Sequence, residues 1–186
     1  MNPDVKKLSD SAAIIASHMG DSNYQKAILL LDKAIAIDSN YFIVYWNKLI
    51  FQSQLKQYGQ AIGTAKNLIR LRPMAPDLYL TCGELYERTD DTLSAKDAFQ
   101  KALSLYNNLL DTMSVGNSYY DMLFMDKAID LVMLGDQIKG NEMLKQLYDR
   151  QTDESYKELI SSFMNKSGAE LLATIDRQQP ATYQVR

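Results

Sequence analysis

The chain has 186 residues, of which 46% are apolar, and it carries a formal net charge of −3. This length and composition suit one domain with a continuous core. A weakly acidic chain has no overall attraction for phosphate backbones, so no nucleic-acid partner is expected. The single cysteine, Cys82, excludes an internal disulfide and a metal site built from several thiolates.

Only four prolines and eight glycines occur, and long runs contain neither, which favours an all-α chain. No apolar stretch reaches the ~18 residues that a membrane-spanning helix needs. The first residues lack the basic-then-apolar pattern of a signal peptide. These features predict a cytoplasmic protein. The alternative is an exported or lipid-anchored bacterial protein whose signal has been removed.

Small residues recur at a fixed interval along the chain. Ala27, Ala61 and Ala95 lie 34 residues apart, and Gly140 follows 45 residues after Ala95. A period of ~34 residues is typical of repeated helix–turn–helix units. A small residue early in each second helix lets the two helices of a unit approach closely. The longer last interval predicts an insert over residues 110–120.

In chain order, the sequence predicts four helix pairs, a capping helix, a short helix and a tail. A stripe of apolar residues at helical spacing supports each pair; in the first it includes Ile28 and Leu31. The whole of 1–177 is expected to form a single solenoid. The predicted ranges are about 8–41, 42–75, 76–109 and 121–154 for the pairs, about 155–165 for the capping helix, 169–177 for the short helix and 178–186 for a flexible tail.

The third pair carries the most complete motif, with the pattern Tyr79, Cys82, Gly83, Tyr86, Ala95, Phe99 and Ala102. This pattern resembles the tetratricopeptide repeat (TPR) consensus, W-x2-L-G-x2-Y…A-x3-F…A…P. In the second pair, Trp46 stands one residue late relative to Ala61, and strict alignment places Tyr45 there instead. The register of that first helix therefore stays open. The resemblance spans roughly 8–154 and implies a right-handed α-α superhelix of antiparallel helix pairs.

The resemblance also implies a non-catalytic scaffold for protein–protein interaction, with a concave groove lined by the first helix of each pair. The groove would be apolar and methionine-rich at its ends and acidic in its middle, which suits an apolar or basic peptide or helix of another protein. Alignment on the small residues assigns these positions to the groove: Ala12, Ala16, Met19, Ile43, Trp46, Asn47, Ile50, Asp77, Leu80, Glu84, Glu87, Met122, Met125, Ile129 and Met133.

Family members that hold a C-terminal carboxylate use Lys, Asn, Asn, Lys and Arg at inward positions. Only one of the five is kept here, because the matching residues are Ala12, Ala16, Asn47, Asp77 and Thr81. A carboxylate ligand is therefore not expected.

Self-association is the main alternative function. The apolar stripe of Leu171, Leu172 and Ile175 could fill the groove of its own chain or of a neighbour, which would make a homodimer. A small-molecule site or an enzyme with a pocket near Glu84 and Glu87 is a distant third reading.

The sequence contains no recognisable catalytic motif. The only histidine, His18, is expected to pack at a helix interface, and Cys82 is expected in the core. No glycine-rich phosphate loop, nucleophile motif or metal-binding motif is present. We therefore expect no catalytic residues, no cofactor and no metal site.

Overall fold

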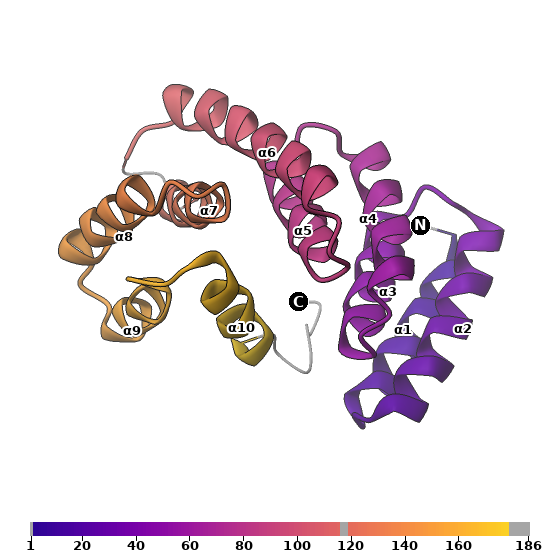
Figure 1. The fold of residues 1–186 in the computed structure, drawn as a ribbon. Helices are drawn as coiled ribbons and strands as arrows, with labels where there is room; N and C mark the ends of the chain where they lie inside the picture. The colour runs from indigo at the N-terminus through magenta and orange to yellow at the C-terminus, as the bar shows by residue number, and fades with distance from the viewer. Residues whose placement is uncertain (1, 116–118, 179–186) are drawn as a thin grey trace. The chain divides into compact units, whose positions relative to one another are not determined.

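The computed structural model describes residues 2–115 and 119–178, and this part of the chain forms ten α-helices and no strands (Figure 1). The predicted all-α class is confirmed. The helices are α1 Pro3–Ser17, α2 Asp21–Ile37, α3 Phe42–Gln54, α4 Tyr58–Leu71, α5 Pro76–Glu87, α6 Thr92–Thr112, α7 Tyr120–Met133, α8 Gln137–Arg150, α9 Glu154–Phe163 and α10 Gly168–Gln178.

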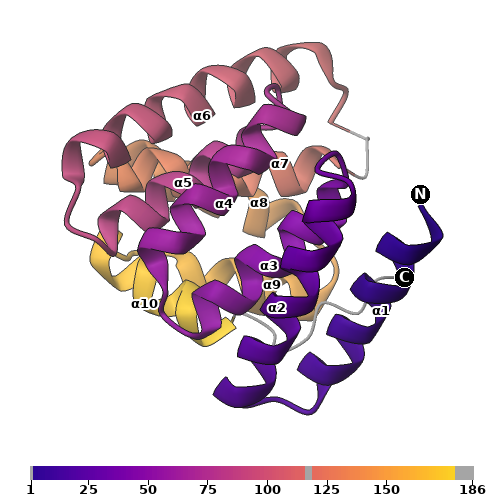
Figure 2. The same cartoon turned by 90° about the vertical axis from the view of Figure 1, so that its right-hand side faces the viewer.

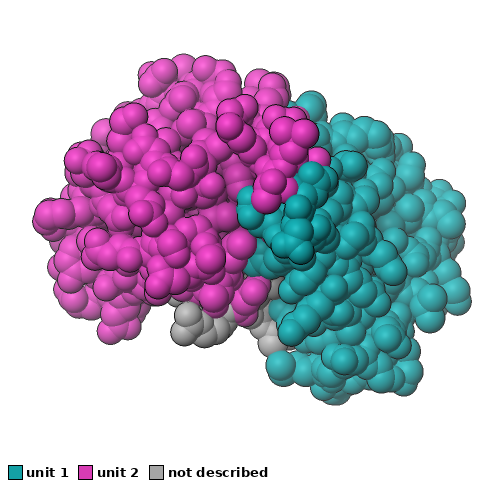
Figure 3. Space-filling model, in the orientation of Figure 1, with its two compact units in different colours: residues 1–73, 85–91, 180–186 teal, residues 74–84, 92–179 magenta. Residues whose placement is uncertain are grey.

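The chain divides into two compact units, coloured teal and magenta in Figure 3. Unit 1 contains 1–73 and 85–91, and unit 2 contains 74–84 and 92–179. The single solenoid expected over 1–177 stays a prediction, and the predicted tail lies outside the described residues apart from Gln178.

The core of unit 1 forms where α1, α2 and α3 meet. Ala27, Leu31 and Val44 have no exposed surface, and the rings of Tyr24 and Phe51 stack with their centres 5.6 Å apart. Aromatic pairs of this kind contribute about 0.5–1.5 kcal/mol beyond their burial. The small residue of the first pair, Ala27, is therefore part of the core in which these helices meet.

The first helix begins five residues earlier than the predicted start of the repeat. The side chain of Asn2 accepts a hydrogen bond from the backbone N–H of Asp4, and Pro3 occupies the first turn, where its missing N–H costs nothing. The helix ends at Ser17, which leaves His18 exposed at the C-cap. The expectation that His18 packs at a helix interface was wrong, because the helix that would have carried it inward has already ended.

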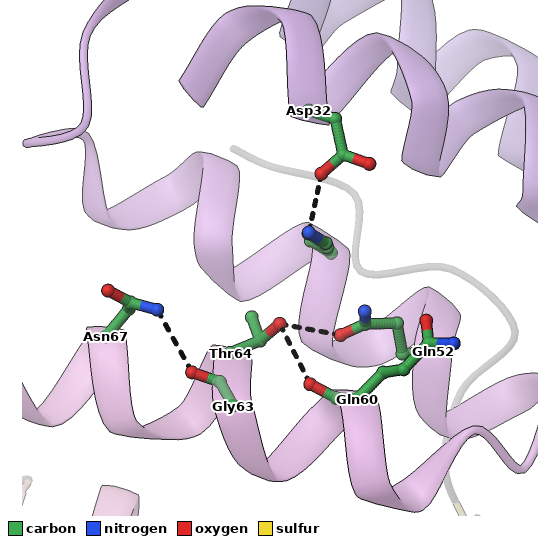
Figure 4. Close-up of polar contacts among 7 residues, drawn as sticks. Asp32, Gln52, Gln60, Gly63, Thr64 and Asn67 are labelled. Carbon is green, nitrogen blue, oxygen red and sulfur yellow. Dashed lines mark hydrogen bonds and ion pairs between the residues drawn. The ribbon is translucent and has the colours of Figure 1, made fainter. Parts of the chain in front are cut away.

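A buried polar contact joins α3 to α4 (Figure 4). The hydroxyl of Thr64 donates to the Gln52 side-chain carbonyl, with the oxygens 2.7 Å apart, and both residues are buried. The Lys48 ammonium pairs with the Asp32 carboxylate at 2.5 Å and so ties α3 to α2. Burying polar groups is tolerated here because each finds a partner.

Unit 2 is built around α7, which contacts α6, α8 and α10. The helix α6 is 21 residues long, and its course is clearest in Figure 2. It runs into the predicted insert as far as Thr112, and α7 begins at Tyr120; residues 116–118 lie outside the description. An ion pair between Arg150 and Asp121, at 2.6 Å, joins the end of α8 to the start of α7.

The last two helices differ in where they pack. The helix α9 contacts α8, whereas α10 turns back and contacts α7 and α9. On α10, Leu171 is fully buried and Thr174 nearly so. The C-terminal helix thus covers part of a first helix rather than extending the series of pairs.

The closest approach of α7 and α8 can be tested at Gly140. A Cβ atom there would lie 2.4 Å from the Val132 side chain and 2.7 Å from the carbonyl oxygen of Ala128. We expect Gly140→Ala to lower the free energy of unfolding by about 1–3 kcal/mol, because the two helices must separate. Chemical denaturation monitored by circular dichroism measures this change.

The matched control is Gly63→Ala on α4, where an added Cβ meets nothing within 4 Å. Alanine is the better helix former, so this variant should be stabilised by about 0.5–1 kcal/mol. Equal effects of the two substitutions would contradict a special role for Gly140.

Candidate functional site

Two faces of the first helices carry the candidate site, one in each unit. In unit 1 it is the face of α3 that bears Ile43, Trp46 and Ile50, spaced three and four residues apart. All three are partly buried, and the two isoleucines also pack against the unit 1 core. This α3 face keeps apolar surface accessible after the helix has packed.

An aromatic stack orients Trp46. Its ring lies 6.0 Å from that of Phe42, nearly parallel, and the Arg72 guanidinium lies 3.8 Å from the centre of the Phe42 ring. A cation over an aromatic face is attracted by the ring quadrupole, which adds about 0.5–1 kcal/mol at exposed sites. Phe42 therefore holds one face of the indole, and Trp46 as a whole stays partly buried.

The register of α3 follows from burial. Tyr45 is 6% exposed and Asn47 is 4% exposed, whereas Trp46 is only partly buried. Tyr45 thus takes the inner position that strict alignment gives it.

The fifteen predicted groove residues differ in accessibility. Met19 and Met122 are exposed. The partly buried ones are Ile43, Trp46, Ile50, Asp77, Glu84, Glu87 and Met133, and the buried ones are Ala12, Ala16, Asn47, Leu80, Met125 and Ile129. The buried residues cannot contact a partner directly in this conformation. Only the exposed and partly buried ones can form a binding surface.

In unit 2 the candidate face combines α7 with the first part of α5. Four acids form what we call the acidic cluster: Asp77 and Glu84 on α5, and Asp126 and Asp130 on α7. Asp130 has no exposed surface, and the other three are partly buried. Sequence reasoning selected Asp77 and Glu84 but missed Asp126 and Asp130. Their spacing of four residues, which places both on one side of a helix, was the available signal.

Burial and mutual repulsion perturb these carboxyls. Burial, followed by the charges of Glu84 and Asp126, raises the pKa of Asp130 to about 8. Burial, followed by Asp77 and Glu84, raises the pKa of Asp126 to about 7. Both shifts have the sign expected when a charge loses water and gains like-charged neighbours.

The hydroxyl of Tyr106 on α6 faces the same cluster. This side chain is fully buried and its oxygen has no hydrogen-bond partner of good geometry. It nevertheless lies close enough to the Asp126 carboxyl to oppose part of the rise in the pKa of that group. Burial and the nearby acids raise the pKa of Tyr106 far above its usual value, so it stays protonated.

Other features of the described chain lie elsewhere or are lacking. Two surface depressions of about 450 and 310 Å³ lie along α8 and α9, away from the predicted groove residues. No three His, Cys, Asp or Glu side chains in the described ranges come together as a metal site. None of the described helices is long and apolar enough to cross a membrane.

Antiparallel helix pairs joined by close-approach small residues define an all-α repeat protein. Residues 76–109 match the family model of the tetratricopeptide repeat, over the same range as the third predicted pair. A comparison with curated proteins found no match. Residues 76–109 therefore form one tetratricopeptide repeat, and the other helix pairs resemble it in fold.

Solved structures with the same fold include other TPR proteins. TTC0263 from Thermus thermophilus is 17% identical, with a TM-score of 0.58 over 93% of this chain and 89% of that one. MamA from Desulfovibrio magneticus is 18% identical, with a TM-score of 0.55 over 80% and 76%. YrrB, described as a TPR protein with an unusual peptide-binding site, is 16% identical, with a TM-score of 0.52 over 92% and 84%. At these identities the likeness concerns the fold.

The raised pKa values predict how stability depends on pH. On unfolding, the carboxyls of Asp126 and Asp130 regain ordinary pKa values near 4. From about pH 4 to about pH 8 the folded state therefore binds more protons than the unfolded state, so the free energy of unfolding falls as the pH rises. We expect Asp130→Asn, which cannot ionise, to flatten this fall by at least about 1 kcal/mol between about pH 5 and pH 8. Denaturation at both pH values measures it.

Asp97→Asn is the control, because Asp97 is an exposed acid on α6 in the same unit. It should follow the wild type at both pH values. If the wild type and Asp130→Asn lose the same stability between the two pH values, Asp130 is not the group that couples folding to protons.

Proposed function

We propose that this protein is a non-catalytic interaction module that binds an apolar or basic segment of another protein on its first helices. The carrying observation is the α3 face, where Ile43, Trp46 and Ile50 stay partly accessible although they are large and apolar. Partly accessible apolar side chains that share one helix face offer a contact surface for a partner. TPR proteins are in general interaction scaffolds, and the peptide-binding site in the description of YrrB is consistent with this role.

The chemistry of the two faces sets the kind of partner. On α3 the accessible surface is aromatic and aliphatic, which suits apolar anchors at helical or extended spacing. On α5 and α7 it is acidic, which favours cations and repels carboxylates. Apolar residues of a partner therefore suit the α3 face, and basic residues suit the face of α5 and α7.

Trp46 is the only tryptophan, so it reports binding directly. We expect peptides selected from a random displayed library to be rich in apolar and basic residues, to shift the Trp46 emission to shorter wavelength and to protect it from acrylamide quenching. Trp46→Glu should weaken the same peptides by about tenfold or more in fluorescence anisotropy with labelled peptide, because a charge replaces an apolar anchor.

Leu29→Glu is the matched control, because Leu29 is an apolar residue of α2 that is 62% exposed. It should bind as the wild type does. Equal loss in the two variants, or no loss in a folded Trp46→Glu variant, would place the binding surface away from α3.

The second candidate is a structural unit whose groove is occupied by its own C-terminal helix. One observation favours it: α10 packs on α7, and Leu171 of its apolar stripe is fully buried there. Leu172 and Ile175 are only partly buried. In this form α10 and a partner would compete for α7.

Solution mass separates the intramolecular form from a dimer. With α10 on its own chain, sedimentation equilibrium should give 21.2 kDa at every concentration. A mass that rises with concentration, and that a Leu172→Lys variant returns to the monomer value, would support exchange of α10 between two copies.

A further inference from the structure

Two buried polar side chains in unit 2 lack hydrogen-bond partners. Both carboxyl oxygens of Asp130 are buried and unpartnered; the hydroxyl of Tyr106 is also buried and has no partner of good geometry, although it acts on the nearby Asp126 carboxyl. A buried polar group without a partner costs about 1–3 kcal/mol, and an ionised one costs more. Groups of this kind in a native protein call for an explanation, such as a ligand that completes the site.

The unpartnered carboxyl of Asp130 lies among other acids. Asp126 is one helical turn before it on α7, and Glu84 acts on it from α5. Asp77, also on α5, acts on Asp126. Asp77, Glu84 and Asp126 are partly accessible and Asp130 is not, so the acidic cluster has a rim and a floor.

Building on the interaction function proposed above, we propose that the acidic cluster binds the ammonium or guanidinium group of a basic side chain from a partner protein. Asp77, Glu84 and Asp126 receive the cation at the rim. Asp130 and Tyr106 lie behind them and supply the polar atoms that are left unpartnered in the free protein.

A basic side chain fits this cluster better than a metal ion does. Metal sites need several ligand atoms at short distances around one point, and no such group of three occurs among the described acids, cysteine and histidine. Lysine and arginine instead carry their charge on a long apolar stem. Such a stem can bring one charge to the acids at the rim while the rest of the partner stays outside the cluster.

Asp126 and Asp130 bind protons more tightly than ordinary carboxyls do. With pKa values of about 7 for Asp126 and about 8 for Asp130, the cluster retains protons at neutral pH and avoids the repulsion of its charges. A bound cation stabilises the ionised carboxylates and therefore displaces those protons. Cation binding and proton release are therefore linked, and the proton release can be measured at Asp126 and Asp130.

The test follows the aspartate carboxyl carbons by NMR in protein labelled with ¹³C-aspartate, from acid to alkaline pH. The probes are n-butylammonium chloride and n-propylguanidinium chloride, each compared with sodium chloride at equal ionic strength. Both organic cations should lower the pKa values of Asp126 and Asp130 by about one pH unit or more at saturation. Sodium chloride should have a smaller effect that does not saturate.

Two variants locate the effect. Glu84→Gln removes one rim charge and should weaken the action of n-butylammonium on Asp130, and Asp126→Asn should do the same if the first variant folds poorly. Glu142→Gln changes an exposed acid of α8 and should leave the action unchanged. Circular dichroism melts confirm that each variant is folded.

Three results would overturn the proposal. Equal lowering by sodium and by the organic cations would show charge screening alone. A larger, saturable effect of magnesium chloride would identify a metal site. Unchanged pKa values with every probe would leave Asp130 as a protonated carboxyl of the core.

The partner's side chain is tested with basic peptides selected from the same displayed library on the whole protein. Replacing their lysines or arginines one at a time by norleucine should cost about tenfold in affinity at one position for the wild type. The same replacement should cost less than about twofold for the Asp126→Asn variant, because the interaction it removes is already lost. Equal costs in both proteins would contradict contact between that side chain and the cluster.

Failure of this inference and failure of the interaction function look different. If peptide binding depends on Trp46 but no probe changes the pKa values of the aspartates, the interaction function is supported and the cation site is contradicted. If the organic cations act on Asp126 and Asp130 while Trp46→Glu leaves peptide binding intact, the cation site stands and the α3 surface falls.

Discussion

The close approach of two helices at a small residue is the constraint on which the rest of this structure depends. Ala27, Ala61 and Ala95 have no exposed surface, and at Gly140 even a methyl group would overlap the facing helix. Packing at such short distances excludes water along the whole pair and lets larger side chains interlock on either side. Each pair forms from residues that are close in sequence. The need for a small residue is therefore repeated along the chain, and it is visible as the regular spacing of Ala27, Ala61 and Ala95.

This local origin explains how much of the fold could be predicted. The spacing of the small residues predicted the helix pairs, and the apolar stripes predicted which side of each helix is buried. The register of α3 could not be obtained in the same way, because Tyr45 and Trp46 are both large aromatic residues. The structure separates them: Tyr45 is buried, whereas Trp46 is partly buried and stacks on Phe42, whose ring also contacts Arg72. His18 was misplaced for a related reason, since the end of α1 at Ser17 is a matter of one residue.

The candidate site was harder to predict than the fold. Alignment by repeat assigns Met125 and Ile129 to the inner face and is silent about Asp126 and Asp130. Acids usually lie on solvated faces, so the sequence alone favoured exposed positions for both. Their burial comes from contacts between helices far apart in sequence, which no local pattern records. The docking of α10 on α7 is a related case: the apolar stripe and the groove as its receiver were visible in the sequence, but the particular first helix was not.

The apolar packing of α7 and the burial of Asp130 have opposite effects on stability. Its apolar residues gain stability by packing against α6, α8 and α10, whereas Asp130 loses the water that a carboxyl prefers and gains no hydrogen bond in return. A leucine at that position would remove this cost. Sequences specify their structures through many mutually consistent choices, and the places where one choice conflicts with the rest are often functional. Because the rim of the cluster is accessible and its floor is not, the conflict lies where a long cationic side chain from outside could resolve it, and a free carboxyl could not.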